Sequence, residues 1–185
     1  MEETFKSKEM SRRQMLKATA AAGALIAAGG IAGVAAAAET TPALAPKLAE
    51  RPEKASKRFM ASMNCSQAIC EVYGPSLGLS AEVAGRIGTG FAGGMGLGSE
   101  CGAATGAVAI LGLKYGPDTG KTMAKVGEFM VEFRKRCGDT SCSKLLKVDM
   151  GTPEGVKAAA DKGLFTTACP GFVRTAGEIL EKMLA

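Results

Sequence analysis

The feature that most restricts the fold of this chain is a glycine-rich stretch near its middle, Gly88–Gly98. It reads GTGFAGGMGLG, so six of its eleven residues are glycine. Because glycine loses more backbone entropy on folding than any other residue, a long regular helix or strand is costly here. We therefore expect a loop. Its purpose has two open interpretations: it lets backbone N–H groups come close to cysteine sulfur atoms, or it lets helices pack tightly.

Apolar residues on both sides of this loop recur at helical spacing. The pattern predicts helices over 52–73, from Ser80 into the loop, and over 101–115, 119–136 and 170–184, with a short helix near 143–147 and a segment starting at Pro153. Ser80 is a typical N-cap residue. Gly102 and Gly106, four residues apart, would allow another helix to approach closely. We expect an all-α fold, a compact bundle of about five helices with a glycine-rich loop.

The N-terminal segment is typical of an export signal. The pair Arg12-Arg13 stands in SRRQMLK, and an Ala/Gly-rich apolar run follows it as far as Ala38. This order matches a twin-arginine signal peptide. A membrane anchor is the alternative, but the run is only weakly hydrophobic for that role. We predict a signal peptide over 1–38, a linker over 39–51 and one domain over 52–185, exported to the periplasm or another extracytoplasmic site. Membrane contact would arise only through an uncleaved signal segment.

The composition excludes several classes of function. Residues 39–185 carry a net charge of +3 without a dense basic face, which argues against a nucleic-acid partner. The absence of histidine excludes a Cys-x-x-Cys-His haem site, the usual zinc hydrolase sites and imidazole-based triads. The G-x-G-x-x-G match at Gly88–Gly93 follows a helical segment, and the P-loop-like Gly116–Thr122 is one residue short, so no nucleotide is expected.

Six cysteines carry the main chemical signal. An even number in an exported protein is what three disulfides would give. However, the twin-arginine route carries proteins already folded in the cytoplasm, where thiols are reduced and iron–sulfur clusters are assembled. Thiolates without histidine select soft metals. No Cys-x-x-Cys occurs, so ligands would have to converge from separate segments. On the residues alone, a metal site and disulfides are equally supported.

Several motifs, in order, resemble the C-GCAxxG-C-C family of redox proteins. They are Asn64-Cys65-Ser-Gln-Ala, Gly90-Phe-Ala-Gly-Gly-Met-Gly, Cys101-Gly-Ala-Ala-Thr-Gly106, Cys142 followed by Leu145-Leu146, and Cys169-Pro170 before a terminal helix. The similarity covers about residues 59–184. In one departure, Ser99-Glu100 precedes Cys101 where the family name has glycine.

This resemblance implies a single site made of Cys65, Cys101, Cys142 and Cys169. In the similar domain of split-Soret cytochrome c, cysteines hold a [2Fe–2S] cluster, so the resemblance implies an iron–sulfur cluster here, without haem. Cys70 and Cys137 lie outside the four-cysteine pattern. They would either form a disulfide in an oxidising compartment or remain free thiols that pack as small apolar side chains.

The preferred functional hypothesis is an electron-transfer protein, rather than a catalyst, that serves a redox partner protein of unknown identity. Two alternatives stay open. One is a metal-free thiol/disulfide redox protein, against which the missing Cys-x-x-Cys pair argues. The other is a structural module stapled by disulfides. A monomer and a homodimer are both compatible with the sequence.

Overall fold

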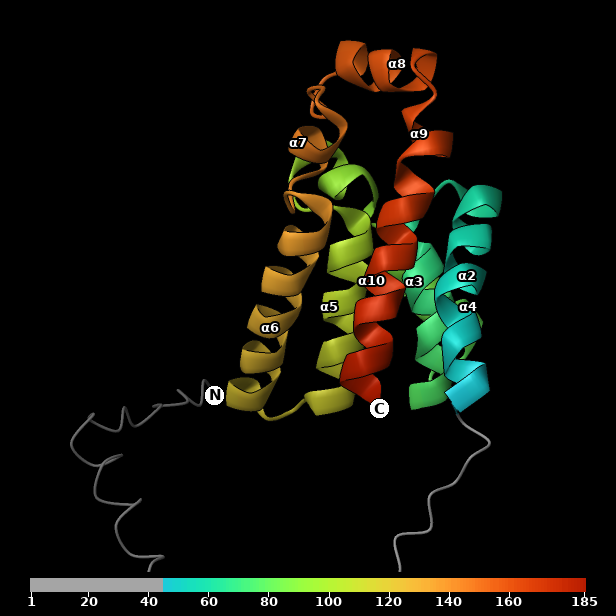
Figure 1. Ribbon diagram of the computed structural model, residues 1–185, viewed down its shortest axis with the longest axis vertical. Coiled ribbons are helices and arrows are strands. Elements are labelled where there is room, and N and C mark those ends of the chain that lie inside the picture. Colours follow the sequence, from blue (N-terminus) through green and yellow to red (C-terminus); the bar gives the residue numbers. More distant parts are fainter. Residues whose placement is uncertain (1–44) are drawn as a thin grey trace, which may run out of the picture. The chain divides into compact units, whose positions relative to one another are not determined.

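The computed structural model describes residues 45–185, which fold into helices joined by short loops (Figure 1). The α-helices are α2 (Ala45–Ser62), α3 (Cys65–Tyr73), α4 (Ala81–Thr89), α5 (Gly102–Tyr115), α6 (Thr119–Cys137), α7 (Cys142–Leu146), α8 (Pro153–Asp161), α9 (Leu164–Thr167) and α10 (Cys169–Leu184). Two further helical turns are η1 (Gly74–Leu77) and η2 (Gly94–Gly98). The described residues form no strand, so the all-α prediction is confirmed. The predicted signal segment, with Arg12 and Arg13, lies outside the described residues.

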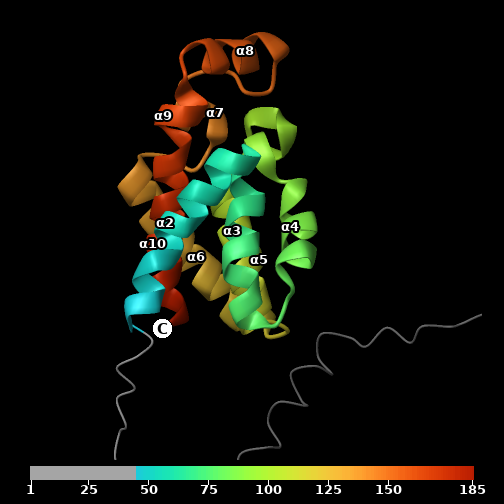
Figure 2. The same ribbon diagram turned by 90° about the vertical axis from the view of Figure 1, so that its right-hand side faces the viewer.

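The longer helices form a bundle that is covered at one end by the short ones. Helix α10 contacts α2, α5 and α6, while α3 contacts α2, α4 and α5. In both views of the ribbon, α7, α8 and α9 lie at the same end of the bundle as the glycine-rich loop (Figures 1 and 2). Across residues 45–185, none of the helices has the combined length and apolarity needed to cross a membrane.

Side-chain caps define where several helices begin. Asn64, Ser80 and Asp118 each accept a hydrogen bond from the backbone N–H three residues further on, at the starts of α3, α4 and α6. Such a cap satisfies an otherwise unpaired N–H group and contributes about 1 kcal/mol. The prediction that Ser80 caps a helix is confirmed.

Three predicted boundaries differ from the structure. The single helix expected over 52–73 is two helices, because Met63 adopts a left-handed φ of 52° and Asn64 starts a new helix. The predicted linker over 39–51 is partly helical, since α2 begins at Ala45. Helix α9 was not predicted; it has four residues and follows Gly163, whose φ of 64° ends the preceding helix.

The core of the bundle combines aromatic side chains with very small residues. Its largest fully buried side chains are those of Tyr73, Phe129, Phe133, Ile69, Leu111 and Leu180. A Cβ atom added at Gly106 would lie 2.9 Å from the carbonyl oxygen of Ser66, so α3 and α5 touch through their backbones there. The close approach predicted for the 101–115 helix is therefore confirmed, and α3 is the helix that makes it.

Candidate functional site

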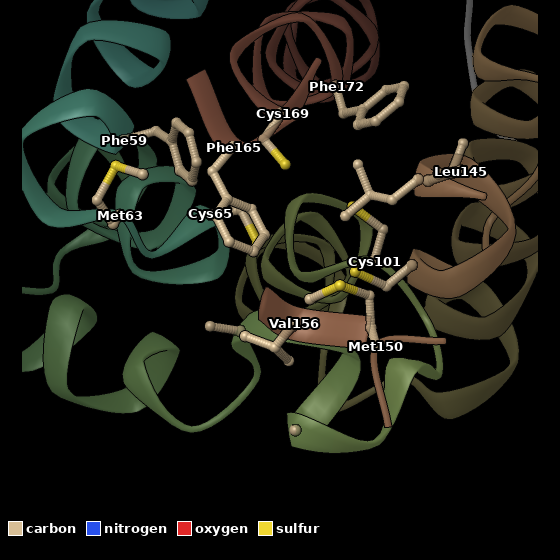
Figure 3. Close-up of a pocket in the computed structure, with 15 residues that line it drawn as sticks. Phe59, Met63, Cys65, Cys101, Leu145, Met150, Val156, Phe165, Cys169 and Phe172 are labelled. Carbon is tan, nitrogen blue, oxygen red and sulfur yellow. The ribbon is translucent and has the colours of Figure 1, made fainter. Parts of the chain in front are cut away.

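A cavity of about 350 Å³ lies at the end of the bundle that the short helices cover. Cys65, Cys101, Cys142 and Cys169 all line it, so the structure brings together the four cysteines named from the sequence. Figure 3 labels three of them, Cys65, Cys101 and Cys169. Cys65, Cys101 and Cys142 are buried, with 9%, 5% and 7% of their surface exposed, and Cys169 is partly buried.

Each of the four cysteines stands at the start of a helix. Cys65, Cys142 and Cys169 are the first residues of α3, α7 and α10, and Cys101 is the N-cap residue of α5. The N-terminus of a helix carries a partial positive charge and free N–H groups, which favour a thiolate over a thiol. Three of these helices have nine or more residues, whereas α7 has five and contributes less. The fold therefore supplies positive potential to the cavity from its backbone.

Backbone hydrogen bonds join the starts of α5 and α7. The N–H of Cys101 donates to the carbonyl of Thr140 at 2.7 Å, and the N–H of Cys142 donates to the carbonyl of Ser99 at 2.6 Å. These two bonds surround the bridge between Glu100 and Ser141. Two cysteines that are 41 positions apart in sequence are thus held side by side by a short antiparallel contact.

The position of Cys65 depends on the preceding residue, Asn64. Its side-chain oxygen accepts the N–H of Gln67 at 3.0 Å, and its side-chain nitrogen donates to the carbonyl of Thr89 at 3.0 Å. Asn64 therefore caps α3 and also ties that helix to the last residue of α4. Thr89 also belongs to the glycine-rich stretch, so the tie links Asn64 to its first residues.

Cys65 has the most acidic thiol of the four. Its pKa is lowered to about 7, chiefly because the thiol of Cys101 donates a hydrogen bond to its sulfur, although burial opposes this effect. The backbone N–H groups of Gly93 and Ser66 also donate to this sulfur. Gly93 has a φ of 62°, a conformation that favours glycine. The thiolate form is therefore favoured at Cys65 more than at the other three cysteines.

The other three thiols are harder to ionise. The hydrogen bond to Cys65, together with burial, raises the pKa of Cys101 well above its ordinary value. Burial raises the pKa of Cys142 to about 11 and that of Cys169 to about 12, with a smaller contribution from the charge on Cys65. Any metal bound by these thiols must therefore displace their protons, and binding will be stronger at higher pH.

The rest of the cavity wall is apolar. No charged side chain of the described residues lines it, and the larger members of the wall are Phe59, Met63, Leu145, Met150, Phe165 and Phe172 (Figure 3). Sequence reasoning assigned none of these residues to a cavity, although Leu145 belongs to one of the motifs. Phe165 and Phe172 stand four residues before and three after Cys169, a helical spacing that could have indicated a shared face.

The two interpretations of the glycine-rich loop apply to different glycines. At Gly93, a backbone N–H group approaches a cysteine sulfur. At Gly88, an added Cβ atom would lie 2.9 Å from the Cα of Gln67, so this glycine permits close packing of α4 on α3. The loop serves both purposes.

The remaining cysteines, Cys70 and Cys137, lie elsewhere and are not joined. The thiol of Cys70 faces the carbonyl of Gly106 at 3.8 Å and lines a second, apolar cavity between α3, α4 and α5. Cys137 ends α6, where its thiol forms a hydrogen bond with Thr175. All six cysteines are free in the structure. Different elements surround Cys70 and Cys137, so the structure holds them as free thiols rather than as the disulfide considered from the sequence.

Comparison with known families gives two matches. The family model described as "putative redox-active protein (C_GCAxxG_C_C)" matches residues 63–183, which include all four cavity cysteines. A model of the twin-arginine translocation pathway signal sequence matches residues 9–29, so the chain carries a signal for export across the cytoplasmic membrane. Neither the curated proteins nor the solved structures give a match.

Proposed function

Because the chain belongs to the C_GCAxxG_C_C family of redox-active proteins, we propose that Cys65, Cys101, Cys142 and Cys169 bind one iron–sulfur cluster. The exported protein then transfers electrons to or from a redox partner protein in the periplasm. The observation that carries this proposal is the gathering of four thiols from four helix starts around one apolar cavity. The resemblance noted above favours a [2Fe–2S] cluster.

The donor set suits a cluster better than a single metal ion. In the part of the chain that the structure describes, no three His, Cys, Asp or Glu side chains converge on one ion position. A structural zinc ion needs four ligands arranged tetrahedrally around one point. The cysteines of a cluster bind different iron atoms and therefore stand further apart. Four thiols around a cavity of about 350 Å³ are consistent with the larger group.

The chain also supplies what a negatively charged group needs in an apolar cavity. Four thiolates bring more negative charge than the iron–sulfide core of a cluster neutralises, and no cationic side chain of the described residues lines the wall. Backbone N–H groups of Gly93 and Ser66 donate to Cys65, and that of Ala103 donates to Cys101. Such hydrogen bonds to sulfur stabilise the charge and raise the reduction potential.

The side chains that line the cavity support electron transfer rather than catalysis. When bound, a cluster supplies one-electron chemistry. Apart from the thiols, no side chain of the described residues that lines the cavity can donate or accept a proton, so the wall offers no general acid or base for a substrate. Aromatic and aliphatic side chains surround the thiols, three of which are buried.

Iron and acid-labile sulfide analysis of protein purified without oxygen tests this proposal. We expect visible charge-transfer absorption and stoichiometric iron and sulfide. Single serine substitutions at Cys65, Cys101, Cys142 and Cys169 should each lower the iron content. Cys70→Ser is the matched control, because Cys70 is also a buried cysteine but lines another cavity, and it should keep the cluster. A colourless wild-type protein, or equal iron loss in all variants, would reject the proposal.

One observation favours a second candidate function, a metal-free thiol protein. Cys65 and Cys101 already share a hydrogen bond, and the pKa of Cys65 is lowered to about 7. In this case the Cys65 thiolate attacks a partner's disulfide and releases one partner thiolate. The Cys101 sulfur, losing its proton, then attacks the mixed disulfide, so the pair is oxidised to a disulfide and the partner is reduced to a dithiol. The same purification separates the two functions, since this one gives a colourless protein with a rapidly titrated thiol pair.

A further inference from the structure

Helix α5 is apolar on every side, yet one of its sides is not covered. Lys114, near its end, is the one charged residue in its sequence. A helix that is apolar all round belongs in the interior of a protein. Helices α3, α6 and α10 pack against α5, but Val108 and Ala109 are only partly buried and Leu113 is 38% exposed. The uncovered side of α5 therefore has the composition of an interface.

The cavity that Cys70 lines, of about 240 Å³, lies beside this side of α5 and is called the α4–α5 hollow below. Helix α4 stands at the edge of the bundle (Figure 2) and packs mainly against α3 and η1, which leaves a gap between α4 and α5. Ile87 and Leu113 line this gap and are 49% and 38% exposed, so the hollow meets the surface. An exposed apolar hollow of this kind marks an interaction site.

Helix α4 carries an apolar side chain and two opposite charges next to the hollow. Val83 is 43% exposed and does not line the hollow. It stands four residues before Ile87, and residues at this spacing lie on the same side of a helix. Glu82 and Arg86 have the same spacing, lie 3.9 Å apart and are each about four-fifths exposed. The same face of the protein thus holds a hollow, a protruding apolar side chain and one charge of each sign.

We propose that two copies of this chain associate through α4 and α5 about a two-fold axis, with their α4 helices antiparallel. Val83 of each copy enters the α4–α5 hollow of the other. Glu82 of each copy pairs with Arg86 of the partner subunit, and the uncovered side of α5 becomes buried. This inference goes beyond the proposed function, because the interface contains none of the four cluster cysteines.

The face fits a second copy better than another occupant because it is complementary to itself. A two-fold interface uses the same patch on both subunits, so that patch must supply both members of every contact. Here it supplies the hollow and the side chain that fills it, and it supplies both Glu82 and Arg86. Opposite charges arranged in this way fix the register of an antiparallel pair. A small apolar molecule in the hollow would leave Val83 exposed.

Sedimentation velocity of the exported protein, kept reduced, tests this interface. We expect the wild type to sediment as a dimer. Val83→Glu should raise the dissociation constant by at least about tenfold, because it places a charge in the apolar hollow of the other copy. The variant should still fold, since a glutamate three residues after the N-cap Ser80 completes a capping box. Met60→Glu is the matched control and should stay dimeric, because Met60 is also 43% exposed but lies on α2, which packs against α3 and α10.

An exchange of the two charges tests the antiparallel arrangement. Glu82→Arg alone should weaken the dimer, and adding Arg86→Glu to that variant should restore it. Iron and sulfide contents should stay equal to those of the wild type, because none of these residues lines the cysteine cavity.

Three results would overturn the proposed interface and leave the cluster proposal standing. They are a monomeric wild type, equal association of Val83→Glu and Met60→Glu, and a double exchange that leaves the dimer as weak as Glu82→Arg does. A monomer that floats with phosphatidylglycerol vesicles would assign this face to lipid instead.

Discussion

Replacing Gly102 by alanine is expected to push the sulfur of Cys65 out of place. An added Cβ atom would come closer than 3.0 Å to the Cys65 Sγ, and it would lie 3.0 Å from the carbonyl oxygen of Phe91. Carbon contacts are comfortable at about 3.5 Å or more, so the sulfur must retreat by roughly 1 Å. Overpacking of this kind costs about 1–3 kcal/mol. The same shift moves Cys65 away from Cys101.

Gly112, in the same helix, provides the matched control. A Cβ atom added there meets no atom within 4 Å, so Gly112→Ala should stabilise α5 by about 0.5–1 kcal/mol. Urea unfolding of the reduced, metal-free variants should separate their free energies of unfolding by about 1.5–4 kcal/mol. Iron content after anaerobic purification should fall in Gly102→Ala alone. Equal free energies of unfolding and equal iron contents in the two variants would refute this account of the site.

Three further predictions concern the thiols and caps of the metal-free protein. At pH 7, iodoacetamide should modify Cys65 before the other cavity cysteines, as followed by mass spectrometry. Cys101→Ala should slow this reaction more than Cys101→Ser, which keeps a hydrogen-bond donor. Earlier modification of another cavity cysteine would contradict the reasoning. Asn64→Ala and Ser80→Ala should each lower the free energy of unfolding, measured in urea, by about 1 kcal/mol. Only Asn64→Ala should also change the rate at which Cys65 is labelled. Because burial raises the pKa of Cys142 from 9.0 to about 11, the folded state loses stability as the pH rises from 9 through 11. In Cys142→Ala, the urea midpoint should fall less steeply as the pH rises over this range. A midpoint that falls as steeply as in the wild type would contradict the prediction.

The four cavity cysteines could be identified from the sequence, but their meeting point could not. Local pattern did indicate part of the arrangement, because Cys169-Pro170 is a helix start with proline in its first turn. The contact between the starts of α5 and α7 depends on two backbone hydrogen bonds, in which the N–H of Cys101 donates to the carbonyl of Thr140 and the N–H of Cys142 donates to the carbonyl of Ser99. Backbone bonds between distant segments leave no mark in composition or periodicity, so the sequence could not show this contact.

The break between α2 and α3 was missed for a different reason. Both helices bury one face against the same core, so apolar spacing continues across Met63 and looks like one helix. A local signal was present, since Asn64 is followed three residues later by Gln67, the spacing of a capping box. Weighing caps together with periodicity would have located the start of α3, and with it the placement of Cys65 at a helix N-terminus.

A crystal structure of protein purified without oxygen, with anomalous scattering recorded at the iron absorption edge, tests the central claim most directly. The account predicts one iron peak group inside the cavity, bonded to the sulfurs of Cys65, Cys101, Cys142 and Cys169. Iron bound at another place, or a cavity without iron in which these sulfurs are paired as disulfides, would contradict it.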